Sequence, residues 1–245
     1  MNWAGQCVLV TGGTRGIGRA LVTGLLARGA KVWATGRSEA SVGQAACEVP
    51  AANWLMCDVV DPAARTRLAA LVEQASINIV IHNAGIQALR DFTAAPGDEA
   101  ASHAEEIGIN LLAPIDITRE LLPLLRRQPM AALVFITSGL ALAPKQSSPV
   151  YCATKAGLRF FAKALRGQMR TQGWPVRIVE ALPPIVDTDM TRGRGSRKMS
   201  PDAAARQILD GVAQGRDEIY VGASRLLKML LRLSPALGER VMIHR

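Results

Sequence analysis

The sequence has few of the residues that mark several protein classes. Its 245 residues include four cysteines and 4% aromatic residues. Cys7, Cys47, Cys57 and Cys152 lack the spacing of metal ligands, so we expect no metal site and no disulfide scaffold, but reduced thiols in a cytoplasmic protein. With so few aromatic side chains for base stacking and no nucleic-acid-binding module, nucleic acid is not an expected partner.

Long apolar runs are also missing. No run approaches the roughly 18 residues of a transmembrane helix. The first residues, MNWAGQCVLV, lead into an apolar strand without the charged region and cleavage site of a secretory signal. Hydrophobic residues nevertheless make up 49% of the chain, enough to bury a sizeable core. Because no linker or repeat divides it, we expect a single domain over residues 1–245.

Apolar strands alternate with amphipathic helices along the chain. The pattern predicts strands at 7–11, 31–35, 54–57, 77–82, 132–137, 177–182 and 219–221, and helices at 17–28, 62–74, 103–127, 151–171 and 201–215. Continuously apolar strands that alternate with helices form a parallel sheet covered on both faces. The sequence therefore predicts an α/β doubly wound Rossmann fold with a mostly parallel seven-stranded sheet.

A glycine-rich turn follows the first predicted strand. Gly12, Gly16 and Gly18 open the first helix, where glycine permits positive φ angles and backbone N–H groups can approach a pyrophosphate at the positive helix end. The alternative is a tight turn without a ligand, but the order of strand, turn and helix favours a dinucleotide site.

The residues after the second strand bear on the choice of cofactor. An acidic residue commonly holds the ribose 2′-hydroxyl of NAD at this point, but this chain has Arg37 there. Arg15, inside the glycine turn, could flank a 2′-phosphate from the other side. Despite the nearby carboxylate of Glu39, the sequence favours NADP (NADPH), with NAD less favoured.

One of the two tyrosines, Tyr151, lies one helical turn before Lys155. A neighbouring ammonium favours the phenolate and brings the phenol pKa towards neutrality. The pair therefore suits proton transfer to or from a carbonyl oxygen.

Several motifs together resemble the short-chain dehydrogenase/reductase family. They are TGGTRGIG at 11–18, NAG at 83–85, Asn110, Ser138 and YxxxK at 151–155. The stretches LLAPIDIT at 111–118, SGLAL at 138–142, PVYCATKAG at 149–157 and PPIVDTDM at 183–190 are most similar to its DltE-like oxidoreductase subgroup.

The resemblance implies a catalytic set. Tyr151 would be the general acid or base, and Lys155 would lower its pKa and hold the nicotinamide ribose. Ser138 would hydrogen bond to the substrate oxygen, and Asn110 would order a relay water. Independently, Pro114 has no N–H and would leave the carbonyl of Asn110, four residues earlier, free to accept a hydrogen bond.

The resemblance also implies the cofactor contacts and a homodimer or homotetramer. The expected cofactor-binding residues are Gly12, Thr14, Arg15, Gly16, Ile17, Gly18, Arg37, Asp58, Val59, Asn83, Ala84, Gly85, Tyr151, Lys155, Pro183, Val186 and Thr188.

Two residues depart from the family pattern. His82 stands where Asn is frequent, and we expect it to pack at a strand end. Pro184 stands where Gly is frequent, and its fixed φ and missing donor could shift the nicotinamide contacts.

Two segments remain beside the motifs. Residues 183–200, PPIVDTDMTRGRGSRKMS, are the longest irregular segment and are predicted to form a substrate lid. Residues 223–245 form a basic amphipathic tail, in which leucines alternate with Arg225, Lys228 and Arg232. Packing or oligomer contact is the favoured role of this tail, with peripheral membrane contact or binding of acidic substrates as the alternatives.

These patterns predict an NADP(H)-dependent oxidoreductase that transfers a hydride between nicotinamide and a carbonyl or secondary alcohol. Flanking apolar residues favour an apolar small-molecule substrate; they are Leu140, Leu142, Val150, Ile185 and Met190. The alternative is a non-catalytic NADP-binding sensor or scaffold. A nucleotide-sugar epimerase shares the Tyr–Lys pair, but the glycine spacing and the short carboxyl-terminal region argue against it.

Overall fold

A computed structural model describes residues 1–93 and 102–243 of the chain. Its frame is a seven-stranded sheet in the order β3-β2-β1-β4-β5-β6-β7, and every pairing among the described strands is parallel. The strands are β1 (Cys7–Val10), β2 (Lys31–Gly36), β3 (Asn53–Met56), β4 (Ile79–His82), β5 (Ala131–Ile136), β6 (Val176–Leu182) and β7 (Glu218–Tyr220). The predicted doubly wound fold is confirmed, and the strand order reverses between β1 and β4.

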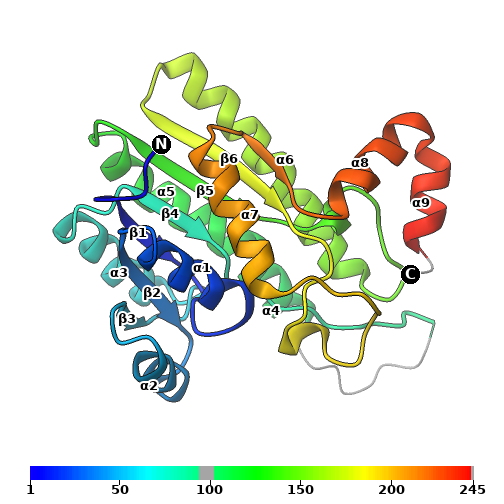
Figure 1. Cartoon of the computed structure of the whole chain (residues 1–245), viewed down its shortest axis with the longest axis horizontal. Helices are drawn as coiled ribbons and strands as arrows, with labels where there is room; N and C mark the ends of the chain where they lie inside the picture. The colour runs from blue at the N-terminus through cyan, green and yellow to red at the C-terminus, as the bar shows by residue number, and fades with distance from the viewer. Residues whose placement is uncertain (94–101, 244–245) are drawn as a thin grey trace.

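Helices cover both faces of the sheet (Figure 1). They are α1 (Gly16–Leu26), α2 (Glu39–Glu48), α3 (Pro62–Gln74), α4 (His103–Ile107), α5 (Ala113–Leu125), α6 (Pro149–Gln172), α7 (Pro201–Ala213), α8 (Ser224–Leu233) and α9 (Pro235–Ile243). Helices α1 and α7 pack on one face, and α3, α5 and α6 on the other. None of the helices in the described ranges is both long and apolar enough to cross a bilayer.

Successive side chains of each central strand enter the two cores in alternation. In β1, Val8 and Val10 join the core under α1 and α7, whereas Leu9 joins the core under α3, α5 and α6; all three are fully buried. Successive strand residues point to opposite faces. Burial of such a side chain stabilises the fold by about 1.5–3 kcal/mol, so the apolar runs that predict the strands also hold the two layers together.

The predicted helix at 103–127 is wrong in its middle. Helix α4 ends at Ile107, and a π-helical turn, Gly108–Leu112, separates it from α5. The N–H of Ala113 donates to the carbonyl of Gly108, five residues earlier. The next residue, Pro114, has no N–H to offer, and the π turn accommodates this interruption of the α-helical ladder.

The structure also contains a helix that the pattern did not predict. Ser38 caps α2, and its side chain accepts a hydrogen bond from the N–H of Ser41. Only Ala45 of this helix is buried. Because little of the helix faces a core, apolar residues recur only weakly at helical spacing in its sequence. The capping serine is therefore the clearest sequence feature that predicts this helix.

Two segments stand at the carboxyl end of the strands (Figure 1). The predicted lid leaves β6 and is closed at its base by a parallel bridge between Val186 and Met199. The N–H of Asp187 donates to the carbonyl of Met199 over 2.8 Å. The basic tail forms α8 and α9, and its last two residues, 244–245, lie outside the described ranges.

Candidate active site

A cleft of about 1160 Å³ opens at the carboxyl ends of the strands. Every predicted site residue except Asn110 lines it. These residues are Gly12, Thr14, Arg15, Gly16, Ile17, Gly18, Arg37, Asp58, Val59, Asn83, Ala84, Gly85, Ser138, Tyr151, Lys155, Pro183, Val186 and Thr188. Parallel strands all end at one edge, which is why residues spread over 177 positions of sequence can meet here.

The glycine turn needs its glycines. Gly12 has φ +65° and Gly16 has φ +54°, a region that side chains disfavour. A Cβ at Gly12 would lie 2.8 Å from Cα of Ala84. The turn therefore packs directly against the loop after β4. It leads into the first turn of α1, whose free N–H groups can bind an anion.

Asn83 holds this turn in place. Its side-chain Nδ2 donates to the carbonyls of Thr11 and Gly12 over 3.0 and 2.9 Å. In return, the Thr11 hydroxyl accepts hydrogen bonds from the N–H groups of Asn83 and Ala84. The NAG motif thus joins the loop after β4 to the loop after β1, and the amide of Asn83 acts on the protein's own backbone.

The two arginines predicted to select the cofactor lie at one end of the cleft. Arg15 is exposed beside the glycine turn. Arg37 follows β2 and donates to Glu105 over 2.9 Å, with its side chain 65% exposed. The opposing carboxylate, Glu39, is exposed at the start of α2 and does not line the cleft. Two cations and no lining carboxylate from the β2–α2 loop favour a phosphate here.

Tyr151 and Lys155 lie in the first two turns of α6. The Lys155 ammonium is 5.7 Å from the centroid of the Tyr151 ring and donates to the carbonyl of Ile136 over 3.0 Å. Loss of water around the phenol raises the pKa of Tyr151 to about 12, although a hydrogen bond with Ser138 opposes the rise. Burial lowers the pKa of Lys155 to about 8.

The sign of the Tyr151 shift differs from the sequence-based expectation. That expectation assigns Lys155 the task of lowering the phenol pKa, but here desolvation dominates and the pKa of Tyr151 rises. The ammonium of Lys155 is directed to a backbone carbonyl instead. The phenol is consequently neutral at physiological pH and carries a proton that it can donate.

Ser138 stands directly after β5 and is 9% exposed. Its hydroxyl accepts a hydrogen bond from the N–H of Leu140 over 3.1 Å and caps a short 3₁₀ turn, Gly139–Ala141. The same hydroxyl interacts with the phenol of Tyr151. Ser138 and Tyr151 can therefore contact the same oxygen of a bound molecule.

Asn110 lies behind the cleft rather than in it. It is fully buried in the π turn, and its side chain accepts from the N–H of Ile86 and donates to the carbonyl of Ile86 and the hydroxyl of Thr154. That hydroxyl in turn donates to the carbonyl of Tyr151 over 2.8 Å. The side chain of Asn110 thus ties the NAG loop to α6, and a relay role for its carbonyl stays a prediction.

The two departures from the family pattern have different settings. His82 is 2% exposed, stacks on Phe135 with ring centroids 4.8 Å apart, and lies 3.3 Å from the Thr118 hydroxyl. Burial lowers the pKa of His82 to about 3, so the ring is neutral and packs at the end of β4, as expected. Pro184 lines the cleft at the start of the lid.

Some residues of the cleft wall belong to no sequence motif. Gln87, Lys145, Arg194, Leu227 and Met242 line the cleft although no motif marks them. Only the basic run RGRGSRK around Arg194 offered a signal. Of the residues expected to form an apolar wall, Leu140, Ile185 and Met190 line the cleft, whereas Leu142 and Val150 do not.

Comparison with known proteins gives close similarity over most of the chain. The model of the family described as short chain dehydrogenase matches residues 6–198. The uncharacterized oxidoreductase DltE of Bacillus subtilis (strain 168) is 38% identical over 227 residues, which are 89% of each protein. The 3-oxoacyl-(acyl-carrier-protein) reductase FabG of Escherichia coli (strain K12) is 34% identical over 221 residues, 88% of this chain and 85% of that protein.

Solved structures share the fold. A short chain dehydrogenase from Burkholderia cenocepacia J2315, in complex with NADP, superposes over 100% of both chains with a TM-score of 0.88 and 24% identity. A short chain dehydrogenase/reductase from Burkholderia phymatum, in complex with NAD, covers 97% of this chain and 96% of its own with a TM-score of 0.85 and 20% identity.

Proposed function

The chain belongs to the short-chain dehydrogenase family, whose members are NAD(P)-dependent oxidoreductases, and we propose that it uses NADP(H) to interconvert a carbonyl and a secondary alcohol. The resemblance to the DltE-like subgroup is confirmed by the identity with DltE. The observation that carries the proposal is the meeting of Tyr151, Lys155 and the glycine turn in one cleft.

The cradle fits a dinucleotide. Its glycines allow the positive φ angles and the close backbone packing of the turn, and the start of α1 offers N–H groups to a pyrophosphate. Asp58 and Val59 are suited to the adenine end, and Pro183, Val186 and Thr188 to the nicotinamide end. A bound nicotinamide supplies or accepts the hydride.

The side chains of α6 and β5 then handle the proton. In reduction, the neutral phenol of Tyr151 donates its proton to the carbonyl oxygen, while the Ser138 hydroxyl holds that oxygen by a hydrogen bond. Lys155, which stays mostly protonated below its pKa of about 8, stabilises the resulting phenolate. The reverse reaction uses the same groups with the phenolate as base.

Preference for NADP rests on Arg15 and Arg37. Both guanidinium groups border the cleft next to the β2–α2 loop, and Arg37 would exchange Glu105 for a 2′-phosphate. Replacement of Arg37 by Gln should weaken NADPH binding at least several-fold and leave NADH binding unchanged, as measured by titration of cofactor fluorescence. An equal loss for both cofactors would contradict the assignment.

The function is tested by Tyr151→Phe. Removal of the hydroxyl should lower turnover of a carbonyl panel, followed by NADPH absorbance, at least a thousandfold while NADPH still binds. Retained turnover would reject the role of the phenol. Binding of NADPH by the wild-type protein without oxidation by any carbonyl would favour a sensor or scaffold instead.

We also propose a homo-oligomer in the cytoplasm. Phe160 on α6 is 72% exposed and Leu112 is 52% exposed, an apolar surface that a second copy could cover. All four cysteines are free. Sedimentation at several protein concentrations distinguishes the dimer from the tetramer.

A further inference from the structure

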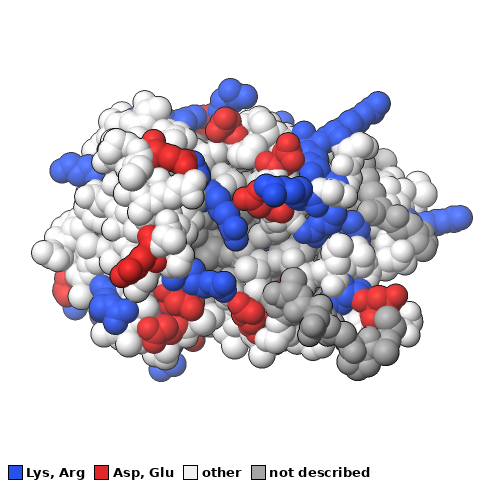
Figure 2. Space-filling model, turned by 90° about the horizontal axis from the view of Figure 1, so that it is seen from below, with Lys and Arg blue, Asp and Glu red and all other residues white. Residues whose placement is uncertain are grey.

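The substrate end of the cleft carries cations that the proposed reaction does not use. The basic residues that line the cleft are Arg15, Arg37, Lys145, Lys155, Arg194, Arg197 and Lys198. Only two lining carboxylates, Asp58 and Asp189, face them within the described ranges. Seen from below the view of Figure 1, Lys and Arg are frequent in the right-hand half of the surface, where the lid and the tail helices lie (Figure 2).

Most of these cations already have a task. Arg15 and Arg37 border the nucleotide cradle, and Lys155 belongs to the Tyr–Lys pair. Lys198 lies 3.3 Å from Asp187 and donates to the carbonyl of Thr191. Arg194, Lys145 and Arg197 remain, and among the described residues none of the three has a carboxylate partner within 4 Å. Arg197 is exposed, whereas Arg194 and Lys145 are partly buried.

Arg194 is held in place rather than exposed at random. Its Nη1 donates to Oε1 of Gln87 over 3.0 Å, and Nε2 of Gln87 donates to the hydroxyl of Ser148 over 3.0 Å. Ser148 is fully buried directly before α6, three residues from Tyr151. These hydrogen bonds connect the guanidinium of Arg194 to the start of α6, the helix that carries the phenol of Tyr151.

The guanidinium also lies close enough to Tyr151 to act on it. Arg194 opposes the rise of the Tyr151 pKa, and burial lowers the pKa of Arg194 itself. A guanidinium has five N–H donors, and the described contacts engage one of them. Partial burial of a guanidinium that has free N–H donors and no carboxylate partner costs free energy, unless a bound anion accepts hydrogen bonds from those donors.

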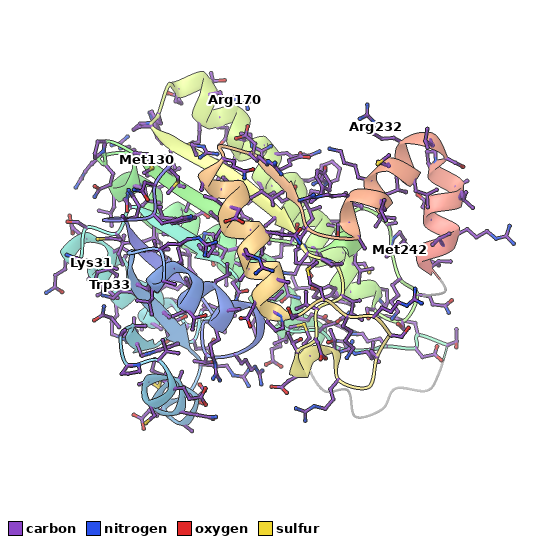
Figure 3. All side chains as sticks on the ribbon, in the orientation of Figure 1. Lys31, Trp33, Met130, Arg170, Arg232 and Met242 are labelled. Carbon is purple, nitrogen blue, oxygen red and sulfur yellow. The ribbon has the colours of Figure 1, made fainter. Side chains whose placement is uncertain are left out.

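Apolar side chains line the same cleft, and they include Leu140, Ile185, Leu227 and Met242. A Cβ at Gly195, the residue after Arg194, would lie 2.8 Å from Ile185. Leu227 and Met242 come from α8 and α9, and the N–H of Gln146, next to Lys145, donates to the carbonyl of Ile243 in α9. Figure 3 shows Met242 on the inner side of the tail helices, whereas Arg232 extends from the outer side of α8.

We propose that Arg194, Lys145 and Gln87 form a subsite for a carboxylate of the substrate, so that the protein reduces oxo acids with an apolar chain. The planar fork of Arg194 can donate two parallel hydrogen bonds to a carboxylate, and Lys145 adds a second positive charge. This substrate class rests on the proposed carbonyl reduction, but the anion subsite can be tested apart from turnover.

The experiment compares oxo acids with their neutral methyl esters. Initial rates with NADPH are measured for 2-, 3- and 4-oxo acids of four to eight carbons and for the matching esters. The wild-type protein should prefer the acid of at least one pair by tenfold or more in kcat/KM. Arg194→Gln should lower kcat/KM for that acid by about ten- to a hundredfold, mainly through KM, and should lower kcat/KM for the ester much less.

Arg192→Gln is the matched control. Arg192 lies on the same lid, its side chain is 82% exposed and pairs with Asp189, and it does not line the cleft. This variant should keep the wild-type preference. Lys145→Gln should lower kcat/KM for the acid less than Arg194→Gln does, because the lysine ammonium is a point charge and lacks the planar fork of N–H donors that arginine has.

Binding distinguishes failure of the subsite from failure of the proposed reaction. The same acids and esters are titrated calorimetrically into the protein saturated with NADP. Acid binding that depends on Arg194, without turnover, would support the subsite and reject the reduction. Equal kcat/KM for acid and ester, the same loss for both in Arg194→Gln, or no acid binding would overturn the subsite.

Discussion

The two halves of the cleft differ in the parts of the chain that form them, backbone in one and side chains in the other. The cofactor half consists of backbone: the glycine turn after β1, the loop after β4 and the start of α1, locked together by Asn83. The substrate half consists of side chains from the lid, α8 and α9, joined to the fold by longer polar groups such as Gln87. The first half leaves little space for change, whereas several residues of the second half border solvent.

This difference indicates how one fold serves different reactants. The cofactor half must fit the same nucleotide at every turnover, so close contact between backbone segments is an advantage. The substrate half can change by side-chain replacement without disturbing the sheet. Two pairs of variants test whether the two halves differ in rigidity as well as in composition, and a pH dependence tests the packing beside the cofactor half.

The largest expected effect comes from a pair of glycines. Gly12 and Gly193 have similar angles, φ +65° and φ +73°, so alanine strains the backbone equally, by about 1 kcal/mol. Only at Gly12 would the new Cβ also meet backbone, 2.8 Å from Ala84 Cα. Gly12→Ala should abolish NADPH binding and lower the free energy of unfolding by several kcal/mol, whereas Gly193→Ala should cost about 1 kcal/mol and keep binding.

Urea unfolding and cofactor titration measure both variants. The lid variant serves as the control for backbone strain, since no atom of the described residues lies within 4 Å of its added Cβ. Similar losses in the two variants would mean that the lid is as tightly constrained as the glycine turn.

A pair of amides gives the next largest effect. Asn83→Ala removes the donors to the Thr11 and Gly12 carbonyls and should lower the free energy of unfolding by about 2–4 kcal/mol. Gln87→Ala removes two hydrogen bonds at the more open end and should cost about 1 kcal/mol or less. Equal costs in urea denaturation would contradict the difference between the halves.

The smallest effect depends on pH and concerns His82, next to Asn83. Its folded-state pKa is about 3 against 6.5 for the free side chain, so below pH 6.5 the unfolded chain binds a proton that the folded one does not. The free energy of unfolding should therefore decrease as the pH is lowered below 6.5, by about 1.4 kcal/mol per pH unit from this group and by about 2 kcal/mol at pH 5. His82→Phe should remove that slope.

Unfolding free energies at pH 7 and pH 5 test this prediction. Carboxylates contribute to acid loss in both proteins, so the difference between wild type and His82→Phe isolates the imidazole. Parallel pH profiles would show that His82 takes up a proton in the folded state.

The parts of the site that sequence predicts are those encoded locally. The glycine turn and the Tyr151–Lys155 spacing each lie within one strand–turn–helix unit or one helix, so a short pattern suffices. The bond between Gln87 and Arg194 joins residues 107 positions apart, and no periodicity relates them. The same holds for Arg37 and Glu105, whose pairing depends on how α4 approaches the β2–α2 loop.

Electrostatics shows the same limit. The spacing of Tyr151 and Lys155 predicts a lowered phenol pKa, because it places an ammonium nearby. Desolvation, which raises that pKa to about 12, depends on tertiary packing, which also brings Ser138 and Arg194 close enough to act on the phenol. The π turn at Gly108–Leu112 is predicted in part. Pro114 indicates that the α-helical hydrogen bonding is interrupted, but it does not indicate that the interruption takes the form of a π turn.

The bridge between Val186 and Met199 has a consequence for the history of such proteins. Because it brings the two ends of residues 187–198 together, the intervening stretch leaves the fold and returns to it at a single point. Lengthening such a loop costs only about 0.6 kcal/mol for each doubling. A duplicated gene could therefore lose, gain or exchange residues of this stretch beyond Thr188 and acquire a new reactant while it keeps its nucleotide.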